Sequence, residues 1–242
     1  MKRRAVEHPK ISDLPKLRNR VQVFRDRASA GKVLADMLEE HRGSDALVMG
    51  IPAGGLAVAV VIARELNLAL DVAVVSKITL PWNTEAGYGA VAFDGTVMLN
   101  EELLSRLNLS DQEIQNGIKK TEQKVSRRVT MFRGDRPLPD FKSPIILVDD
   151  GLASGFTLRV AIKALRRNGA TNVILAVPTA HSDSVKRVLE EVGAIYCPNL
   201  RNGLSFAVAD AYERWTDLDE QEVIRLLQQF KSGNQRPIPE EA

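Results

Sequence analysis

The chain has 242 residues, 44% of them hydrophobic, which suffices for one large α/β domain or two small ones. Its 33 basic and 31 acidic residues leave a net charge of +2, so no global field favours nucleic acid or an anionic membrane. The single cysteine, Cys197, excludes an intrachain disulfide and fits a reducing compartment. No run approaches the about 20 apolar residues that cross a bilayer, so we expect a cytoplasmic protein with no membrane partner.

The first third of the chain predicts an arm and then a β-loop-α-β unit. Residues 1–20 are basic and lack a sustained apolar period, which predicts a flexible N-terminal arm. Apolar positions recur at helical spacing from Ala30 to Leu38, with Gly43 as a plausible stop. A strand at 46–49, a helix at 56–66 and a strand at 71–76 follow, and a connection of this kind implies parallel pairing.

The middle of the chain departs from this alternation. Two short apolar runs between residues 90 and 99 flank Asp94-Gly95, which is typical of a hairpin turn. Ser110-Asp-Gln-Glu113 matches a capping box that begins a long amphipathic helix, expected to end near Phe132. Residues 134–144 contain three prolines and indicate a linker back to the core.

The last part alternates strands at 145–148, 173–177 and 194–197 with helices at 156–168, 182–192 and 217–230. This order predicts an α/β fold, a doubly wound parallel sheet with an antiparallel hairpin and a helical insertion. We expect a single domain over residues 21–232, with the insertion and linker at 100–140, and a disordered tail at 233–242. Four loops should meet at the carboxyl ends of the strands, after Met49, Ser76, Val148 and Val177.

The most specific motif is Ile145-Ile-Leu-Val-Asp-Asp-Gly-Leu-Ala-Ser-Gly-Phe-Thr157. An apolar strand ends in Asp149 and Asp150, and small and hydroxyl residues then form the turn into a helix. Such a turn can direct backbone N–H groups and hydroxyls at a phosphate, while the acids suit ribose hydroxyls or Mg²⁺. Two acids at a strand end are often only a turn or helix cap, but the whole arrangement is more specific. No Gly-Lys-Ser/Thr follows, which excludes a Walker A loop.

Two further segments point to the same edge of the sheet. The glycines of Gly50-Ile-Pro-Ala-Gly-Gly55 let backbone approach a ligand and donate N–H groups to an anion, although a tight βα turn explains them as well. Lys77 follows the expected second strand, where a cation can neutralise phosphate oxygens or simply be exposed to solvent.

The motif Val-Asp-Asp-Gly-Leu-Ala-Ser-Gly-Phe-Thr resembles the 5-phosphoribosyl-1-pyrophosphate (PRPP) motif of type I phosphoribosyltransferases. The likeness is to uncharacterised bacterial and archaeal phosphoribosyltransferases and extends from about Val23 to Leu227. It includes F-x-x-R-x-x-A-G at Phe24–Gly31 and S-K-I at Ser76–Ile78. The resemblance implies that a nucleobase or another nitrogen nucleophile displaces pyrophosphate from C1 of PRPP, with Mg²⁺ carried by PRPP oxygens and water rather than by direct protein ligands.

The resemblance also implies residue roles. Asp149 and Asp150 would hold the ribose hydroxyls, and with Lys77 they are the candidate catalytic residues. The ribose and 5′-phosphate would further contact the turn and helix start, namely Gly151, Ala153, Ser154, Gly155, Phe156 and Thr157. The diphosphate would lie against Pro52, Ala53, Gly54, Gly55 and Lys77. Candidates for the acceptor pocket or a lid are Trp82, Glu85, Tyr88 and His181, although hairpin packing, a turn cap or a solvated loop explains them about as well.

Two departures from the family pattern limit the prediction. Ala53 stands where these relatives carry an arginine, so either another cation substitutes or PRPP binding is weakened. Ala153 stands where enzymes for 6-oxopurines carry an acid, which argues against hypoxanthine and guanine as acceptors. A non-catalytic protein that binds PRPP or a nucleotide for regulation is the main alternative. A nucleotide hydrolase or kinase is a weaker alternative, because the sequence contains neither a Walker lysine nor a catalytic triad.

The remaining expectations concern partners and basic side chains. We expect a homodimer that binds PRPP and a small-molecule acceptor, with no nucleic acid partner. Four arginines late on the long helix and beyond are expected to form a solvated or interface face, with phosphate binding in a partner subunit as the alternative. They are Arg127, Arg128, Arg133 and Arg136.

Overall fold

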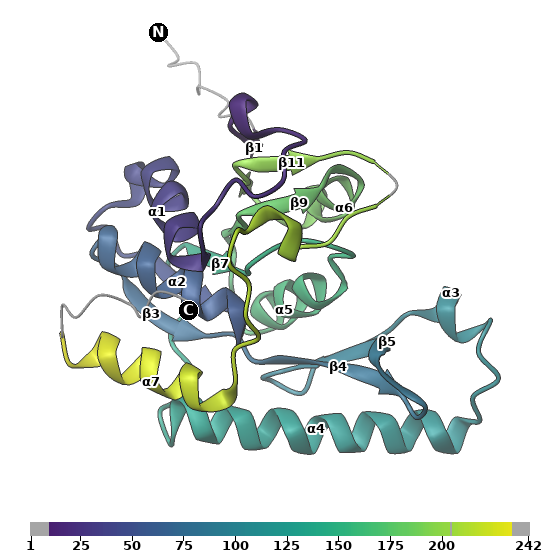
Figure 1. The fold of residues 1–242 in the computed structure, drawn as a ribbon. Helices are drawn as coiled ribbons and strands as arrows, with labels where there is room; N and C mark the ends of the chain where they lie inside the picture. The colour runs from purple at the N-terminus through teal and green to yellow at the C-terminus, as the bar shows by residue number, and fades with distance from the viewer. Residues whose placement is uncertain (1–9, 204, 234–242) are drawn as a thin grey trace, which may run out of the picture.

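The computed structural model describes residues 10–203 and 205–233. Its centre is a six-stranded sheet in which every neighbouring pair is parallel (Figure 1). The strands, in spatial order, are β1 (Ile11–Ser12), β10 (Ala194–Tyr196), β8 (Val173–Ala176), β7 (Ile145–Val148), β2 (Leu47–Gly50) and β3 (Ala69–Val72). All four residues of β7 are buried, as expected for a central strand covered on both faces.

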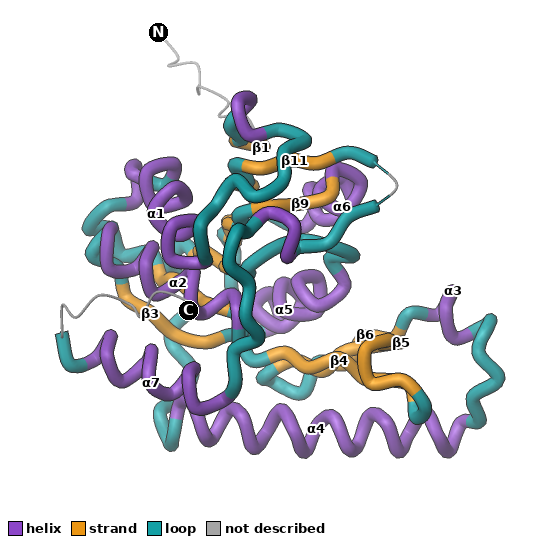
Figure 2. Tube along the Cα trace, viewed as in Figure 1, coloured by secondary structure: helices purple, strands orange, loops and turns teal. Residues whose placement is uncertain are grey.

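Helices cover both faces of this sheet (Figure 2). On one face, α1 (Arg27–Met37) and α2 (Gly54–Glu65) pack against the side chains of Val48 and Ile146. On the other face, α5 (Phe156–Arg167) and α6 (Ser182–Val188) pack against Met49 and Leu147. Successive strand residues thus point to opposite faces, which confirms the predicted doubly wound α/β fold.

A second unit projects from the core and consists of an antiparallel sheet and one long helix. The sheet contains β4 (Val75–Leu80), β5 (Asn83–Ala92) and β6 (Val97–Leu99), and it packs on α4 (Asp111–Arg133). We call these four elements the side unit (Figure 1). The predicted capping box is present, because the Ser110 and Glu113 side chains each bond the other residue's backbone N–H.

The side unit corrects two sequence predictions. The strand predicted at 71–76 is split, because β3 ends at Val72 and β4 begins at Val75 in a different sheet. The segment from Ile78 to Gly89, for which no strand was predicted, forms most of a long β-hairpin between β4 and β5. Ile78 and Leu80 are buried while Thr79 between them is half-exposed, so the strand signal was an alternation too short to stand out.

Shorter elements complete the fold. Two parallel strands missed by the sequence analysis are β9 (Thr179–His181) and β11 (Asn199–Arg201). The remaining helices are α3 (Glu101–Leu104), α7 (Glu220–Lys231), and the 3-10 turns η1 (Pro15–Leu17), η2 (Glu39–His41), η3 (Leu189–Glu191) and η4 (Ala209–Ala211). The described helices include none that is both long and apolar enough to cross a membrane.

The N-terminal arm needs a partial correction. Ile11 and Ser12 pair with Ile195 and Tyr196, so β1 is the edge strand of the main sheet and residues 10–20 are not a loose segment. Backbone hydrogen bonds from a short edge strand suffice for this, which is why no apolar period marked it. Residues 1–9 and 234–242, which include part of the predicted arm and most of the predicted tail, lie outside the described residues.

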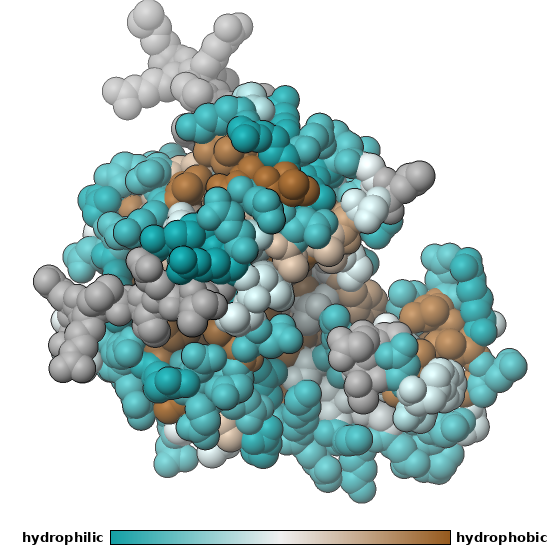
Figure 3. Space-filling view, viewed as in Figure 1, coloured by the Kyte–Doolittle hydropathy of each residue, from teal (hydrophilic) through white to brown (hydrophobic). Residues whose placement is uncertain are grey.

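The surface is mostly hydrophilic on the face shown in Figure 3. Among the described residues, the large apolar side chains with substantial exposure are Val21, Trp82 and Leu138. Trp82 lies at the turn between β4 and β5, with 65% of its surface exposed. An exposed tryptophan at the tip of a projecting hairpin is available to a ligand or to another surface.

Candidate active site

Asp149 and Asp150 lie directly after β7, at the carboxyl end of a central strand. The Asp150 backbone N–H donates to Asp149 Oδ1 at 2.9 Å. Burial, and then the neighbouring Asp150 carboxylate, raises the pKa of Asp149 well above its ordinary value. Burial also raises the pKa of Asp150, although Arg27 opposes that effect. The folded protein therefore favours a proton on Asp149, and either carboxyl group can form a hydrogen bond with a hydroxyl group.

Arg27, at the start of α1, is the principal partner of the acid pair. Its side chain is only 4% exposed, and its Nε lies 2.9 Å from Asp150 Oδ2. The same guanidinium donates to the Thr216 carbonyl at 2.9 Å and lies 3.9 Å from the centre of the Trp215 ring. An arginine in this position fixes one acid and ties it to the C-terminal segment.

No role for Arg27 was predicted from the sequence. The signal was present, because Arg27 is the arginine of F-x-x-R-x-x-A-G, but position within a motif does not reveal a partner 123 residues away. The helix begins there because Asp26 caps it, accepting from the Ser29 backbone N–H at 2.7 Å.

The loop between β2 and α2 lies against the acid pair. Its Pro52–Ala53 peptide bond is cis. A Cβ atom on Gly54 would overlap the Asp150 carboxylate, and one on Gly55 would lie 2.7 Å from Asp149 Cα. Only glycine permits this approach, so the predicted contact between the glycine-rich loop and the acids has a steric basis.

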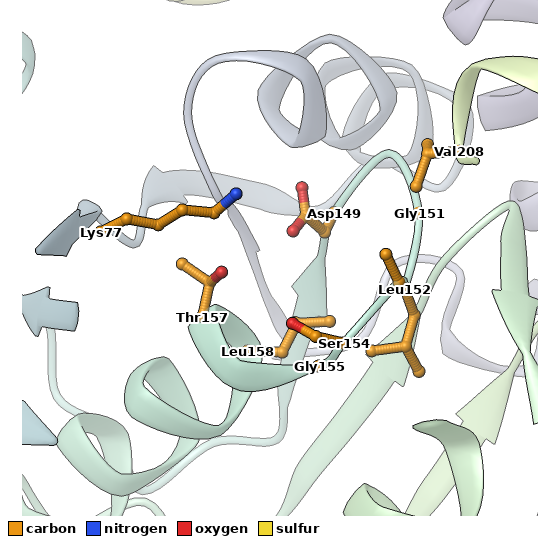
Figure 4. Close-up of a pocket in the computed structure, with 10 residues that line it drawn as sticks. Lys77, Asp149, Gly151, Leu152, Ser154, Gly155, Thr157, Leu158 and Val208 are labelled. Atoms are coloured by element: carbon orange, nitrogen blue, oxygen red, sulfur yellow. The ribbon is translucent and has the colours of Figure 1, made fainter. Parts of the chain in front are cut away.

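The turn after the acids leads into α5 through Gly155, whose φ of 77° is in the left-handed region. The Ser184 hydroxyl donates to the Ala153 carbonyl and so ties the turn to α6. This turn borders a cavity of about 210 Å³, which we call the turn cavity (Figure 4). It is lined by Lys77, Asp149, Gly151, Leu152, Ala153, Ser154, Gly155, Thr157, Leu158 and Val208.

A second cavity of about 380 Å³ lies beside the glycine-rich loop, and we call it the loop cavity. Its lining joins three parts of the chain in addition to the acid pair and Thr157: the loop itself, strand β4 and helix α4. The residues are Ile51, Pro52, Ala53, Gly54, Val75, Ser76, Lys77, Thr79, Lys124, Arg128, Asp149, Asp150 and Thr157. Gly55 is predicted to contact the same ligand but lies behind the loop, against Val148 and Asp149.

Three residues line both cavities: Lys77, Asp149 and Thr157. Lys77 lies inside β4 opposite Ala90, rather than after a strand of the main sheet. Its ammonium group points across the cavity toward Asp149, and Thr157 lies beneath both at the start of α5 (Figure 4). The two cavities thus meet at a cation, a carboxylate and a hydroxyl from three different elements.

The predicted acceptor or lid residues do not meet there. Tyr88 is 1% exposed and packs between the side sheet and α4 near Gly117, so its ring belongs to the core. His181 bonds the Gly203 carbonyl through Nε2 at 2.9 Å and caps α6, so it is structural. Trp82 lies at the hairpin tip, outside both cavities, and the Glu85 side chain lies outside the described residues. Phe156 packs on the core and lines neither cavity.

The four arginines near the end of α4 also do not form one solvated face. Arg133 is buried with its Nη2 3.0 Å from Asp71 Oδ2, and Arg136 approaches the same carboxylate. Arg127 is exposed and pairs with Glu220. Arg128 is 8% exposed and lines the loop cavity of its own chain. The arginines on the helix have different surroundings because consecutive residues of a helix point about 100° apart.

Comparison with known proteins finds similarity to phosphoribosyltransferases. Residues 94–210 match the family model described as phosphoribosyl transferase domain. Two Mycobacterium tuberculosis proteins, from strains CDC 1551 / Oshkosh and H37Rv, are named as phosphoribosyl transferases and are each 33% identical to this chain over 208 residues. These alignments cover 86% of this chain and 47% of each relative, so the chain spans about half the length of the curated relatives it matches.

The crystal structure of the protein TT1426 from Thermus thermophilus is similar with a TM-score of 0.67 and 29% identity. The match covers 86% of this chain and 98% of that one. Residues 94–210 of the chain therefore match the phosphoribosyl transferase domain family, and the chain has an α/β fold similar to that of TT1426, in line with the PRPP-motif resemblance.

Proposed function

We propose that this protein transfers the 5-phosphoribosyl group of PRPP to a nucleobase or another nitrogen nucleophile and releases pyrophosphate. The observation that carries the proposal is the junction of the two cavities at Lys77, Asp149 and Thr157. A substrate with a phosphate at one end and a diphosphate at the other fits two anion sites that share one wall. Its C1 carbon, where the bond to diphosphate breaks, would then lie near the junction.

In this proposal each end of PRPP meets a different part of the chain. The turn from Gly151 to Thr157 binds the 5′-phosphate through backbone N–H groups and hydroxyls at the start of α5. Asp149 and Asp150 accept hydrogen bonds from the ribose hydroxyls. The loop from Pro52 to Gly54, with Lys77, binds the diphosphate.

The chemistry requires charge stabilisation more than a nucleophilic side chain. As the diphosphate departs, C1 gains positive charge, which the nearby Asp149 carboxylate stabilises, while Lys77 offsets the charge on the leaving oxygen. The raised pKa of Asp149 also suits it to accept a proton from the incoming nitrogen. Lys77 and the two acids are thus the proposed catalytic residues.

The donor set fits Mg²⁺ held mainly by substrate and water. The carboxylates at the cavity rim are hard oxygen donors, and the described residues contain no group of three or more His, Cys, Asp or Glu side chains able to cage a metal. When bound to diphosphate oxygens, Mg²⁺ would supply further neutralisation of the leaving group.

The proposed acceptors exclude 6-oxopurines. Ala153 is exposed at the turn cavity and offers a methyl group where an acid would be needed to accept the purine proton. Adenine, pyrimidines and other nitrogen nucleophiles remain within the proposal. We also propose a single domain over residues 10–232, which includes the edge strand β1, together with a homodimer and a cytoplasmic location. Trp82 at the hairpin tip is the proposed lid residue that closes on bound substrate.

Thermal unfolding with millimolar PRPP and Mg²⁺ tests the donor, because a ligand that binds the native state raises the melting temperature. No shift would contradict the proposal and its regulatory alternative together. A screen of nucleobases for pyrophosphate release then separates the two. Binding of PRPP without release for any acceptor would favour a regulatory protein, and the double variant Asp149→Asn, Asp150→Asn should lose both responses.

A further inference from the structure

We infer that Lys124 and Arg128, on helix α4 of the side unit, bind the diphosphate end of the substrate. This inference rests on the proposed function. Both side chains line the loop cavity, although α4 lies far along the chain from the glycine-rich loop and precedes the acid pair by a long linker. The two residues are one helical turn apart, so they face the same cavity wall.

The charges around the loop cavity support this assignment. Its cationic lining residues are Lys77, Lys124 and Arg128, and its anionic ones are Asp149 and Asp150. Asp150 is already paired with Arg27, at 2.9 Å. The glycine-rich loop contributes no charged side chain, because Ala53 occupies its centre. A diphosphate carries several negative charges, so the two α4 cations must supply much of the balance at this end of the substrate.

Arg128 is held in place before any ligand arrives. Its side chain is 10% exposed, and its Nη1 donates to Ser76 Oγ at 3.2 Å. Its Nε lies 3.4 Å from Glu220 Oε1, an ion-pair distance without a hydrogen bond. Desolvation lowers the pKa of Arg128, and the charge of the Glu220 carboxylate opposes that change. A buried, oriented guanidinium loses little freedom when an anion binds.

Lys124 is different, since its side chain is exposed at the cavity rim. Its charge helps to lower the pKa of Glu220, but less than Arg127 and Arg128 do. Lys124 is therefore available to an incoming anion and can be replaced without disturbing the core. Its charge, rather than its packing, is what a substitution would remove.

The experiment compares two ligands that differ only in the diphosphate. Dissociation constants for PRPP with Mg²⁺ and for ribose 5-phosphate are measured by calorimetry on the intact protein. The variants are Lys124→Arg, Lys124→Gln and Lys124→Glu, with Lys119→Gln as a matched control from an exposed position on the same helix. Arg128→Lys is added with its melting temperature, because it keeps the charge at a buried position.

We expect Lys124→Gln to weaken PRPP binding about tenfold and Lys124→Glu to weaken it further, as the local charge is removed and then reversed. Lys119→Gln should bind PRPP as the unaltered protein does, and Lys124→Arg should bind it more tightly than Lys124→Gln because it keeps the charge. Ribose 5-phosphate affinity should not change in any Lys124 variant. Equal weakening of both ligands, or a Lys124→Gln variant that matches Lys119→Gln, overturns the inference. Failure of the unaltered protein to bind PRPP contradicts the proposed function instead.

Discussion

The Nε atom of Arg27 lies 2.9 Å from Asp150 Oδ2, although 123 positions separate the two residues in the chain. The pair joins the start of α1 to the end of β7, and Trp215 and the Thr216 carbonyl complete the surroundings of the guanidinium. One ion pair thereby fixes an acid of the proposed ribose site and three separate segments of the fold.

Removing the arginine should cost stability. Arg27→Ala leaves the Asp150 carboxylate largely buried and unpaired, and we expect the free energy of unfolding to fall by about 3 kcal/mol. Arg27→Lys keeps the charge but loses the planar fork, so its loss should be intermediate. Chemical denaturation measures both, with the exposed Lys32→Ala on the same helix as control. An Arg27→Ala protein as stable as Lys32→Ala would show that the pair contributes nothing to stability.

Replacing the first acid should have the opposite effect on stability. The pKa of Asp149 is raised in the folded protein, so the folded state favours the protonated acid. That contribution is complete below the ordinary value of 3.8 and is lost as pH rises through the raised pKa. The asparagine of Asp149→Asn does not ionise, so the variant avoids the loss of stability that the unaltered protein undergoes when the buried acid becomes charged. We therefore expect its melting temperature to exceed that of the unaltered protein at pH 7 by about 2–4 °C.

Melting temperatures measured from pH 8 to pH 5 test the direction of the Asp149 pKa shift. The difference in melting temperature between Asp149→Asn and the unaltered protein should shrink from pH 8 to pH 5, while PRPP binding is lost throughout. Asp150→Asn should instead destabilise the protein, because it leaves Arg27 without its carboxylate. A difference for Asp149→Asn that is constant across this pH range would argue against a raised pKa at that residue.

The glycine-rich loop should not tolerate a methyl group. In Gly55→Ala the new Cβ would lie 2.7 Å from both Asp149 Cα and the Val148 carbonyl oxygen, and backbone atoms cannot move aside easily. We expect the free energy of unfolding to fall by about 1–3 kcal/mol. PRPP binding should also be lost. Gly193→Ala is the control, since its closest contact would be the end of the Asn172 side chain, at 3.0 Å. Equal melting temperatures for the two variants would contradict the steric argument.

Trp82 provides a test of the hairpin as a lid. Because its side chain is 65% exposed, Trp82→Ala should change stability by no more than about 0.5 kcal/mol. If the hairpin tip closes over substrate, kcat/KM for PRPP should fall about tenfold. Steady-state pyrophosphate release measures the effect. An unchanged kcat/KM would show that the hairpin tip does not act as a lid in the reaction.

Most of the main sheet and the start of α4 were predictable because their signals are local. The run from Ile145 to Val148 and the capping box at Ser110 each occupy a few adjacent residues, and both are confirmed. The strands β9 and β11 were missed because each has only three residues and begins and ends with a polar one, so no apolar run marks them.

The candidate site was predicted only in part, for a related reason. The order of the motif placed Asp149, Asp150 and the turn together, but no local signal assigned Arg27, Lys124 or Val208 to this site. These residues reach the site through the packing of α1, α4 and the C-terminal segment, which depends on contacts between distant parts of the chain. Tyr88 was predicted as a site residue but lies in the core. As an aromatic residue in a glycine-rich segment it suggested a ligand contact, whereas its side chain is buried.

The division of charge between the two units has a mechanical consequence. Both acids directly follow a strand of the main sheet, whereas Lys77, Lys124 and Arg128 all belong to the side unit. The side unit leaves the main sheet at residues 73–74 and returns through the linker at 134–144 (Figure 1). Any rotation about these two crossings would move the three cations together, so a single displacement would change all three proposed contacts to the diphosphate at once.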